Sequence, residues 1–324
     1  ASPAASASPA ASASAAAQAK KAPPPLPRAP HGILPPGAAD RIVKAGARPG
    51  VKVLEPGDEP REKASYAVAK GSEQKVEVLL DVAVGLKQGA QQMPPMTLPR
   101  MSMLMHLAAS DANPAGDAKI DAKLVKIGIE PRGPEQEQAA AALRPQLAAA
   151  KDLAMTYWVT PQGYVRDLKM DTSKFGAGAQ QVLDAMTQSL ESMVSKLPDE
   201  AIGIGARWQV FSRVASAGAD IVKVETFTLK KREREKLSLD VAMTQLAATD
   251  TMDAPGLPPG AKAKITSYRS TGGGDTDLDT KRVSSESGSL RITTGMDLSV
   301  TGPGAAEPST HVETTMNVRF RRPR

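Results

Sequence analysis

Apolar and polar residues alternate with a period of two along most of the chain. The clearest run covers residues 76–86, where Val and Leu at even positions alternate with Lys75, Glu77, Asp81 and Lys87. This period predicts a β-strand with one buried face. Comparable runs predict further strands at 101–107, 119–130, 153–159, 164–170, 207–214, 221–229, 237–245, 264–270, 283–286, 290–300 and 312–320, with a short edge strand at 51–54.

The segments between these runs are rich in Gly, Pro, Asp and Ser, which are turn residues. One of them, Thr160-Pro161-Gln162-Gly163, has the chemistry of a hairpin turn and joins two of the predicted strands. Many short strands separated by such turns indicate an antiparallel sheet, curved or closing on itself. The pattern differs from an alternating βαβ order, and it predicts an α+β, mainly antiparallel β fold.

A helical period appears between residues 179 and 197. Val182, Met186, Leu190, Met193 and Leu197 recur at spacings of four and three, and Pro198 would end the helix. We therefore expect one long amphipathic helix over 179–196, packed against a curved or barrel-like sheet. The Ala-rich segment 135–151 also favours helix, and its Pro145 predicts a break into two short pieces.

The chain divides into two regions of different composition. Residues 1–60 are rich in Ala, Ser and Pro and poor in large apolar side chains, so we expect a disordered tail and linker. Residues 61–324 are expected to form a single strand-rich domain. The Pro-rich stretch 23–28 has a PxxP spacing that suits a peptide-binding groove, although a spacer is the commoner use of such composition.

Composition bears on compartment and partners. The chain has no Cys, starts at Ala1 instead of Met, and contains no run of about 18 apolar residues, so no transmembrane helix is expected. We expect that a signal peptide preceded Ala1; a cloning boundary or a removed tag is the alternative. The net charge is +6, and the densest basic run, 230–236, includes two acids and no aromatic residue. Nucleic-acid binding is therefore not expected.

Two motifs suggest sites that the sequence context does not support. Gly203-Ile204-Gly205 follows a predicted helix and opens a strand, the reverse of a dinucleotide-binding turn. A weak calcium-loop candidate has its ligands at the spacing of a twelve-residue loop, with Thr280 where that loop needs Gly. Its ligands are Asp275, Asp277, Asp279 and Glu286. The alternative is a polar hairpin, and no metal or other cofactor is expected.

Six methionines fall on the apolar side of predicted strands. They are Met101, Met103, Met105, Met243, Met296 and Met316. Methionine adapts to irregular apolar space, and small-molecule sites are concave and mainly apolar. These residues are our candidates for lining a lipid-sized cavity. Ordinary filling of a core that is short of aromatics is the alternative.

Only His31, His106 and His311 could serve as catalytic bases of the imidazole type, and no nucleophile motif accompanies them, so an enzyme is not expected.

The segment from Leu197-Pro198-Asp199-Glu200 through Gly203-Ile204-Gly205-Ala206-Arg207-Trp208 resembles the signature of an uncharacterised family of exported bacterial proteins, often described as lipoproteins. The segments 49–57 and 93–99 are also similar to it. The resemblance implies export to the periplasm, the outer membrane or the exterior, and a mostly antiparallel fold. It carries over no catalytic or binding residue.

From these observations together we expect an exported, non-enzymatic envelope protein that binds an apolar or lipid-like ligand. The alternative is a structural protein of the cell envelope that contacts another protein. The chain lacks the Cys to which a lipid anchor would be attached.

Overall fold

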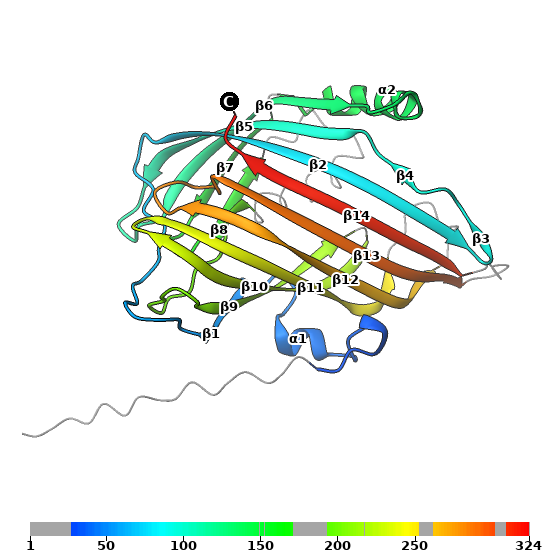
Figure 1. Cartoon of the computed structure of the whole chain (residues 1–324), viewed down its shortest axis with the longest axis horizontal. Coiled ribbons are helices and arrows are strands. Elements are labelled where there is room, and N and C mark those ends of the chain that lie inside the picture. Colours follow the sequence, from blue (N-terminus) through cyan, green and yellow to red (C-terminus); the bar gives the residue numbers. More distant parts are fainter. Residues whose placement is uncertain are drawn as a thin grey trace, which may run out of the picture.

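The computed structural model describes residues 27–148, 150–151, 153–170, 193–216, 218–252, 262–301 and 309–323. Within these residues the strands form one antiparallel sheet, in the order β1-β9-β10-β11-β12-β13-β14-β2-β5-β6-β7-β8 (Figure 1). Two very short strands, β3 and β4, pair with β2. The strands are β1 (Gly50–Glu55), β2 (Glu73–Gln88), β3 (Gln91–Gln92), β4 (Met96–Thr97), β5 (Arg100–Ala112), β6 (Ala118–Glu130), β7 (Ala154–Val159), β8 (Val165–Met170), β9 (Arg207–Ser216), β10 (Ala219–Glu233), β11 (Lys236–Met252), β12 (Lys262–Asp279), β13 (Ser287–Thr301) and β14 (Thr310–Arg321).

Most connections in the sheet are hairpins between strands that follow each other in the chain. The exceptions are at β14, which lies between β13 and β2, and at β1, which pairs with β9. β14 therefore joins two arms of the sheet, one built from β9 to β13 and the other from β2 to β8. Its register places Met316 opposite Val82 of β2 and Ile292 of β13.

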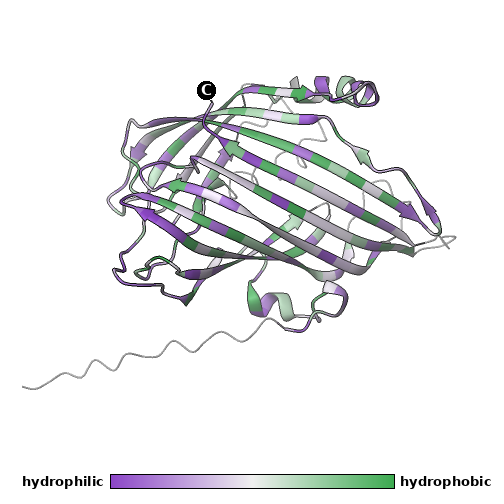
Figure 2. Ribbon diagram, viewed as in Figure 1, coloured by the Kyte–Doolittle hydropathy of each residue, from purple (hydrophilic) through white to green (hydrophobic). Residues whose placement is uncertain are grey.

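Residues that lie directly opposite each other on antiparallel strands point to the same face of the sheet. The registers therefore assign every alternate residue to one of two faces, and Figure 2 shows apolar and polar residues alternating along β2 and β14. Because the sheet curls, one face is concave and the other convex (Figure 1). The concave face carries the largest core cluster, which includes Val76, Leu107 and Trp208 from both arms.

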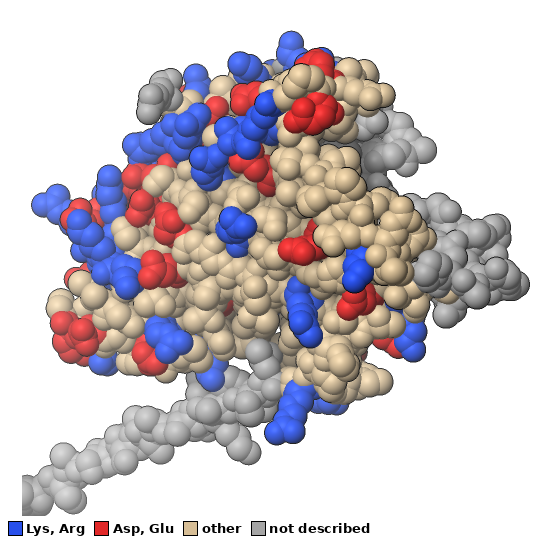
Figure 3. Space-filling view, turned by 45° about the vertical axis from the view of Figure 1, so that its right-hand side comes forward, with Lys and Arg blue, Asp and Glu red and all other residues tan. Residues whose placement is uncertain are grey.

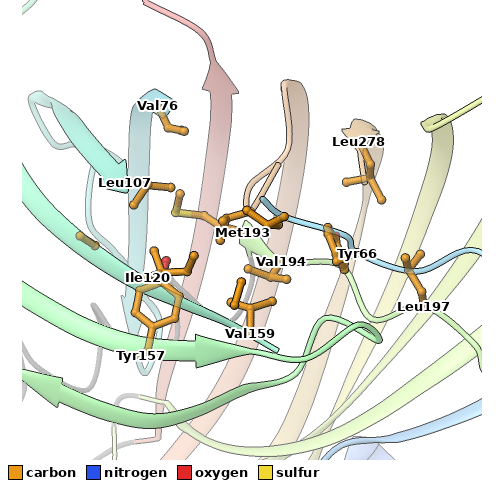
Figure 4. Packing of buried hydrophobic residues seen from close by; sticks show 14 of the residues in the cluster. Tyr66, Val76, Leu107, Ile120, Tyr157, Val159, Met193, Val194, Leu197 and Leu278 are labelled. Carbon is orange, nitrogen blue, oxygen red and sulfur yellow. The ribbon is translucent and has the colours of Figure 1, made fainter. Parts of the chain in front are cut away.

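One end of the concave face is filled by three crossing segments, which we call the plug: residues 64–68, 193–206 and 280–286. Figure 4 shows Met193 and Val194 of the plug lying among Leu107, Ile120 and Tyr157 of the strands. Each of these five side chains is at most 2% exposed. The end of the sheet that the plug covers is called the closed end.

Two helices lie outside the concave face. The short helix α1 (Ala38–Ile42) packs its buried Ala38 and Ala39 on Val222 and Val224, on the convex face of β10. It follows the 3-10 turn η1 (Pro30–Gly32). The helix α2 (Pro134–Ala148) contacts β6, which belongs to the other arm of the sheet.

The strands are antiparallel as expected, but the predicted α+β class, with a sheet packed against one long amphipathic helix, is wrong, because the described chain is mainly β. Residues 171–192 lie outside the described ranges, and at the described end of the predicted helix, residues 194–196 are not helical. The polar groups of these residues are bonded to distant segments instead. The hydroxyl of Tyr66 donates to the carbonyl of Ser195, and the indole N–H of Trp208 donates to the carbonyl of Lys196. In the described part of the chain, α2 is the only helix of seven residues or more, and the sheet is open, since β1 and β8 do not pair.

Other local expectations also differ from the structure. Pro145 lies inside α2, which continues through it to Ala148 instead of breaking. Residues 283–286 form part of the plug and not a strand. Residues 1–26 lie outside the described ranges, whereas residues 30–42, expected in the linker, hold η1 and α1; the short edge strand expected at 51–54 is present as β1. Leu34 and Val43 from this segment are buried against the convex face of the sheet.

Candidate functional site: the concave face of the sheet

Beyond the plug, the apolar side chains of the concave face are only half-buried. On β2 they are Leu80, Val82, Val84 and Leu86. Apolar residues of the same face on the neighbouring strands are also half-buried. These residues are Met101, Met103, Ile127, Ile129, Leu290, Ile292, Met296, Val312, Met316 and Val318. The same face is therefore covered at the closed end and partly open further along the strands.

The six predicted methionines all lie on this concave face. Met105 and Met243 are buried, at 5% and 4% exposure, and the other four are half-buried. Met243 and Met316 belong to one cross-strand row, separated by Gly272 and Ile292. The methionines are thus spread over four strands, and they do not form one compact cluster.

A row of polar side chains crosses the half-open part of the concave face, and the sequence pattern did not reveal it. Its members lie directly opposite one another on six adjacent strands, from β9 to β14. We call it the polar row: Ser212, Lys223, Gln245, Ser270, Thr294 and Thr314. The neighbouring row toward the closed end holds Val210, Met243, Ile292 and Met316, with Glu225 between Val210 and Met243, and the row on the other side holds Ile221 and Met296.

The polar row contributes to an ion pair. Lys223 Nζ lies 3.1 Å from a carboxylate oxygen of Glu225, two residues along β10 on the same face. Both side chains are largely buried, at 15% and 14% exposure. Among the described residues of the half-open concave face, from the row of Trp208 onward, these two are the only charged side chains.

Hydrogen bonds link the middle of the polar row. The side-chain oxygen of Gln245 accepts from the hydroxyl of Ser270 at 2.8 Å and from the phenol of Tyr268 at 3.0 Å. Ser270 and Thr294 are joined through their hydroxyls at 2.8 Å. Burial raises the pKa of Tyr268 above its ordinary value, so this phenol stays protonated and acts as a donor at neutral pH.

Ser212, at the β9 end of the polar row, is 8% exposed, and its hydroxyl has no hydrogen-bond partner among the described residues. A buried polar group without a partner costs about 1 to 3 kcal/mol. The Gln245 amide nitrogen is also poorly matched, because its bonded neighbour is the sulfur of Met243 at 3.8 Å. The polar row therefore has donors without a good partner among the described residues.

The weak calcium candidate is not assembled. Asp275, Asp277 and Asp279 lie along β12 on the convex face, where Ser289 donates to Asp275 and Ser238 donates to Asp277. Glu286 is ion-paired with basic side chains, including Lys236 at 3.5 Å. No group of three or more His, Asp or Glu in the described ranges is arranged to hold a metal ion.

The histidines lie apart from one another. His106 contacts Glu73 at 3.2 Å, His311 Nδ1 contacts Asp297 at 2.6 Å, and His31 lies in η1. His106 and His311 are on the convex face, with the polar residues of β5 and β14. They are therefore not part of the concave site.

Charged side chains gather mainly outside the concave face. Figure 3 shows basic and acidic side chains intermingled on the face in view, with a broad area that carries few charges. Ion pairs outside the concave face include Lys230 with Asp240 and Arg321 with Glu77. None of the described helices is long and apolar enough to span a bilayer.

A second hollow lies between the outer edge of β6 and α2, with a volume of about 340 Å³. Its apolar lining includes Ile127, Ile129 and Leu147, and Lys126 and Arg144 also border it. Only residues 118–123 of β6 pair with β7. Along residues 125–130 this edge of β6 has no neighbouring strand among those described.

Comparisons with known proteins identify no family. No family model matches the chain, and no curated protein matches it. Among solved structures, the chain is similar to one described as lipid–protein interactions in lipovitellin, with a TM-score of 0.45 and 8% sequence identity. The alignment covers 79% of this chain and 25% of that chain, so the chain spans about a quarter of that structure's length.

The sequence did carry a signal for the ion pair of the concave face. Ile221, Phe227 and Leu229 share parity with Lys223 and Glu225, so the two charges interrupt an apolar face. Val222 and Val224 have the opposite parity and are also apolar, so parity alone does not assign the faces of this strand. The ambiguity arises because both faces of β10 are covered, the convex one by α1.

Proposed function

We propose that the protein binds a lipid-like molecule on the half-open part of the concave face. The observation that carries the proposal is the contrast along this one face. At the closed end the plug buries the apolar side chains of this face, whereas beyond the plug apolar side chains of five strands stay half-buried. Apolar surface gains roughly 25 cal/mol for each Å² removed from water, and large open apolar surfaces in proteins mark binding sites.

The methionines support this proposal as part of the lining. Met101, Met296 and Met316 are unbranched and half-buried, so they can adjust to an acyl chain without moving the strands. We propose a binding protein and not an enzyme. By its family resemblance, we place it in the cell envelope. Fractionation of the cells that produce it tests that location, and recovery in the cytosol would contradict it.

The binding is tested by two neighbouring substitutions on β13. Ile292→Glu places a charge on the half-open concave face, whereas Thr293→Glu places the same charge on the convex face. Native mass spectrometry of protein purified from its own host should show a bound lipid, and a fluorescent fatty acyl probe should bind the unaltered protein. We expect Ile292→Glu to weaken probe binding at least about tenfold, since desolvating a charge opposes apolar contact, and Thr293→Glu to leave it unchanged.

A clean ligand-free mass, together with no probe binding, contradicts the proposal. Equal effects of the two substitutions would also contradict it, because they would show that the probe does not distinguish the faces of the sheet. Circular dichroism of both variants establishes that each retains the strand content of the unaltered protein.

The second candidate is a contact with another envelope protein through the edge of β6. Val125, beside the unpaired edge, is 41% exposed, and an unpaired strand edge can accept a strand from a partner. A photo-crosslinker at position 125 in intact cells should then capture a partner, with the same crosslinker at Thr293 as the control. Recovery of the monomer alone would count against this candidate.

A further inference from the structure

The ion pair of the polar row is not explained by stability. Glu225 lies between the apolar Val210 and Met243, Lys223 lies between Ser212 and Gln245, and both charged side chains are about 85% buried. Removing two charges from water is costly, and apolar residues in place of a buried pair often give equal or greater stability. A protein that needed only an apolar lining would gain nothing from this pair. The polar row therefore has another use.

The unused hydrogen-bonding groups indicate what that use is. Lys223 has three N–H donors and one described acidic partner. Within the described ranges, the hydroxyl of Ser212 has no partner and the amide nitrogen of Gln245 has only a sulfur neighbour. The oxygen of Gln245, by contrast, already accepts two hydrogen bonds. The row thus offers donors in excess, which suits a ligand group rich in acceptor oxygens.

The charge of the site narrows the class of ligand. The Lys223 and Glu225 charges sum to zero, and the other members of the row are uncharged. An anionic group brought to Lys223 would also meet the carboxylate of Glu225, 3.1 Å away, and a cationic group at Glu225 would meet Lys223. In a partly dehydrated site each such approach is strongly unfavourable. An uncharged group with oxygen acceptors avoids both repulsions.

The depth of the polar row limits the size of this group. Successive residues on one face of a strand are roughly 7 Å apart, and the rows on both sides of the polar row are mainly apolar, with Glu225 and Tyr268 as their polar members. Only a compact group matches a band of this depth, and hydrocarbon attached to it reaches Met316 or Met296 at once. We infer that the polar row binds the uncharged, oxygen-bearing head of an amphiphile, of the glycerol-ester type, whose chain lies along the flanking apolar rows. This inference rests on the proposed lipid binding.

The test compares three probes that share one acyl chain and differ in the head: a glycerol monoester, a carboxylate and a trimethylammonium. Affinities are measured by displacement of the fluorescent acyl probe. We expect the unaltered protein to bind the glycerol monoester about tenfold more tightly than either charged probe, the size of one or two hydrogen bonds. The double substitution Lys223→Met with Glu225→Met should remove this preference but retain binding of the chain.

The matched control uses another Lys–acid pair of the same hairpin. Lys230 and Asp240 are ion-paired on the outside of the sheet, each 58% exposed, so Lys230→Met with Asp240→Met should keep the preference. Thr314→Val is a second variant of the polar row, because valine has the same shape without the hydroxyl. It should lower the preference about threefold, while its fold stays intact.

The outcomes separate the two proposals. If no probe binds the unaltered protein, the proposed lipid binding fails and the inference fails with it. If all three probes bind equally, or a charged probe binds most tightly, lipid binding stands and the inference is wrong. Persistence of the preference in both the double variant and Thr314→Val would also overturn it.

Discussion

At the scale of single residues, Trp208 holds together segments that are distant in the sequence. Its side chain is fully buried, and its ring stacks on Phe227 at 5.5 Å between centroids and 13° between planes. Its indole N–H donates to the carbonyl of Lys196 at 2.9 Å, which fixes the plug to β9. One residue thus contributes to both the sheet and its closed end.

We expect Trp208→Ala to lower the free energy of unfolding by about 3 to 5 kcal/mol, because it leaves a large cavity and an unpaired carbonyl. Denaturant titration measures the loss. Trp158→Ala is the control, since Trp158 lies on the convex side against Arg166 and is only half-buried. A loss below about 1 kcal/mol for Trp208→Ala would contradict its role in the core.

Asp81 on the convex face predicts a pH dependence. Arg100 donates two hydrogen bonds to its carboxylate, at 2.9 and 3.0 Å, and Arg132 and Arg319 also contact it. The Arg100 guanidinium holds the pKa of Asp81 below its usual value, against the opposing effect of burial. Because the folded pKa is depressed, the stabilisation is complete above the unfolded pKa of about 3.9 and is lost as the pH falls through the folded pKa.

Asp81→Asn should therefore lower stability by about 1 to 3 kcal/mol at pH 7, the range for hydrogen bonds to charged groups. The difference from the unaltered protein should shrink as the pH falls below about 4. Urea titrations from pH 7 to pH 3 provide the measurement. Asp240→Asn, at an exposed pair, should change stability by less than about 1 kcal/mol. A difference for Asp81→Asn that stays constant down to pH 3 would contradict this account.

At the scale of elements, period-2 alternation predicted most strands, and the misses have physical reasons. β12 extends through Gly272-Gly273-Gly274, which the sequence suggested was a turn. A Cβ at Gly274 would overlap the carbonyl oxygen of Ser289, so the adjacent backbone requires glycine here. The predicted helix failed because tertiary hydrogen bonds to its last residues replace helical ones.

The candidate site was predictable only in part. The assignment of the methionines to the apolar face follows from the alternation along each strand, which is local in sequence. The polar row follows from the register of six strands, and register depends on hairpin lengths and on bulges such as the one between Ile265 and Ser267. No local pattern links Ser212 to Thr314.

The segment around η1 is inserted between β11 and β12, and a substitution in it should weaken its attachment to the sheet. The Leu34 N–H donates to the carbonyl of Ala247, and Gly32 has a φ of +74°. A Cβ on Gly32 would overlap the carbonyl oxygen of Tyr268. We expect Gly32→Ala to detach the segment, because both the backbone and the space oppose the new methyl group.

Amide hydrogen exchange at Leu34 measures this detachment and should become much faster in Gly32→Ala. Gly46 is the matched control, since its φ is +72° and no atom lies within 4 Å of the position that a Cβ would take there. Gly46→Ala should show only the cost of the positive φ, about 1 kcal/mol. Unchanged protection of Leu34 in Gly32→Ala would contradict the proposed close packing.

At the scale of the whole molecule, β14 is the connection between the two arms of the sheet. It pairs along its length with β13 on one side and with β2 on the other. The concave face exists as one surface only when this strand is in place. The two arms also share the core at the closed end, where Leu107 of one arm and Leu278 of the other belong to one cluster.

Ending the chain at residue 309 should therefore abolish the single cooperative unfolding transition and expose two long strand edges, which promote aggregation. Circular dichroism and size-exclusion chromatography measure both effects. Removing only residues 322–324, which lie beyond β14, should leave the cooperative transition in place. A monomeric, cooperatively unfolding protein without β14 would contradict this account.

The position of β14 also has a consequence for biosynthesis. The N-terminal part of a chain leaves the ribosome first. β2 is therefore synthesised more than two hundred residues before β14, the strand that pairs with it. During that time the edge of β2 that β14 will cover remains unsatisfied in the nascent protein. A chaperone that shields β2 until β14 emerges would suppress the aggregation of this polypeptide, and the continuous concave face would form only after translation has passed residue 321.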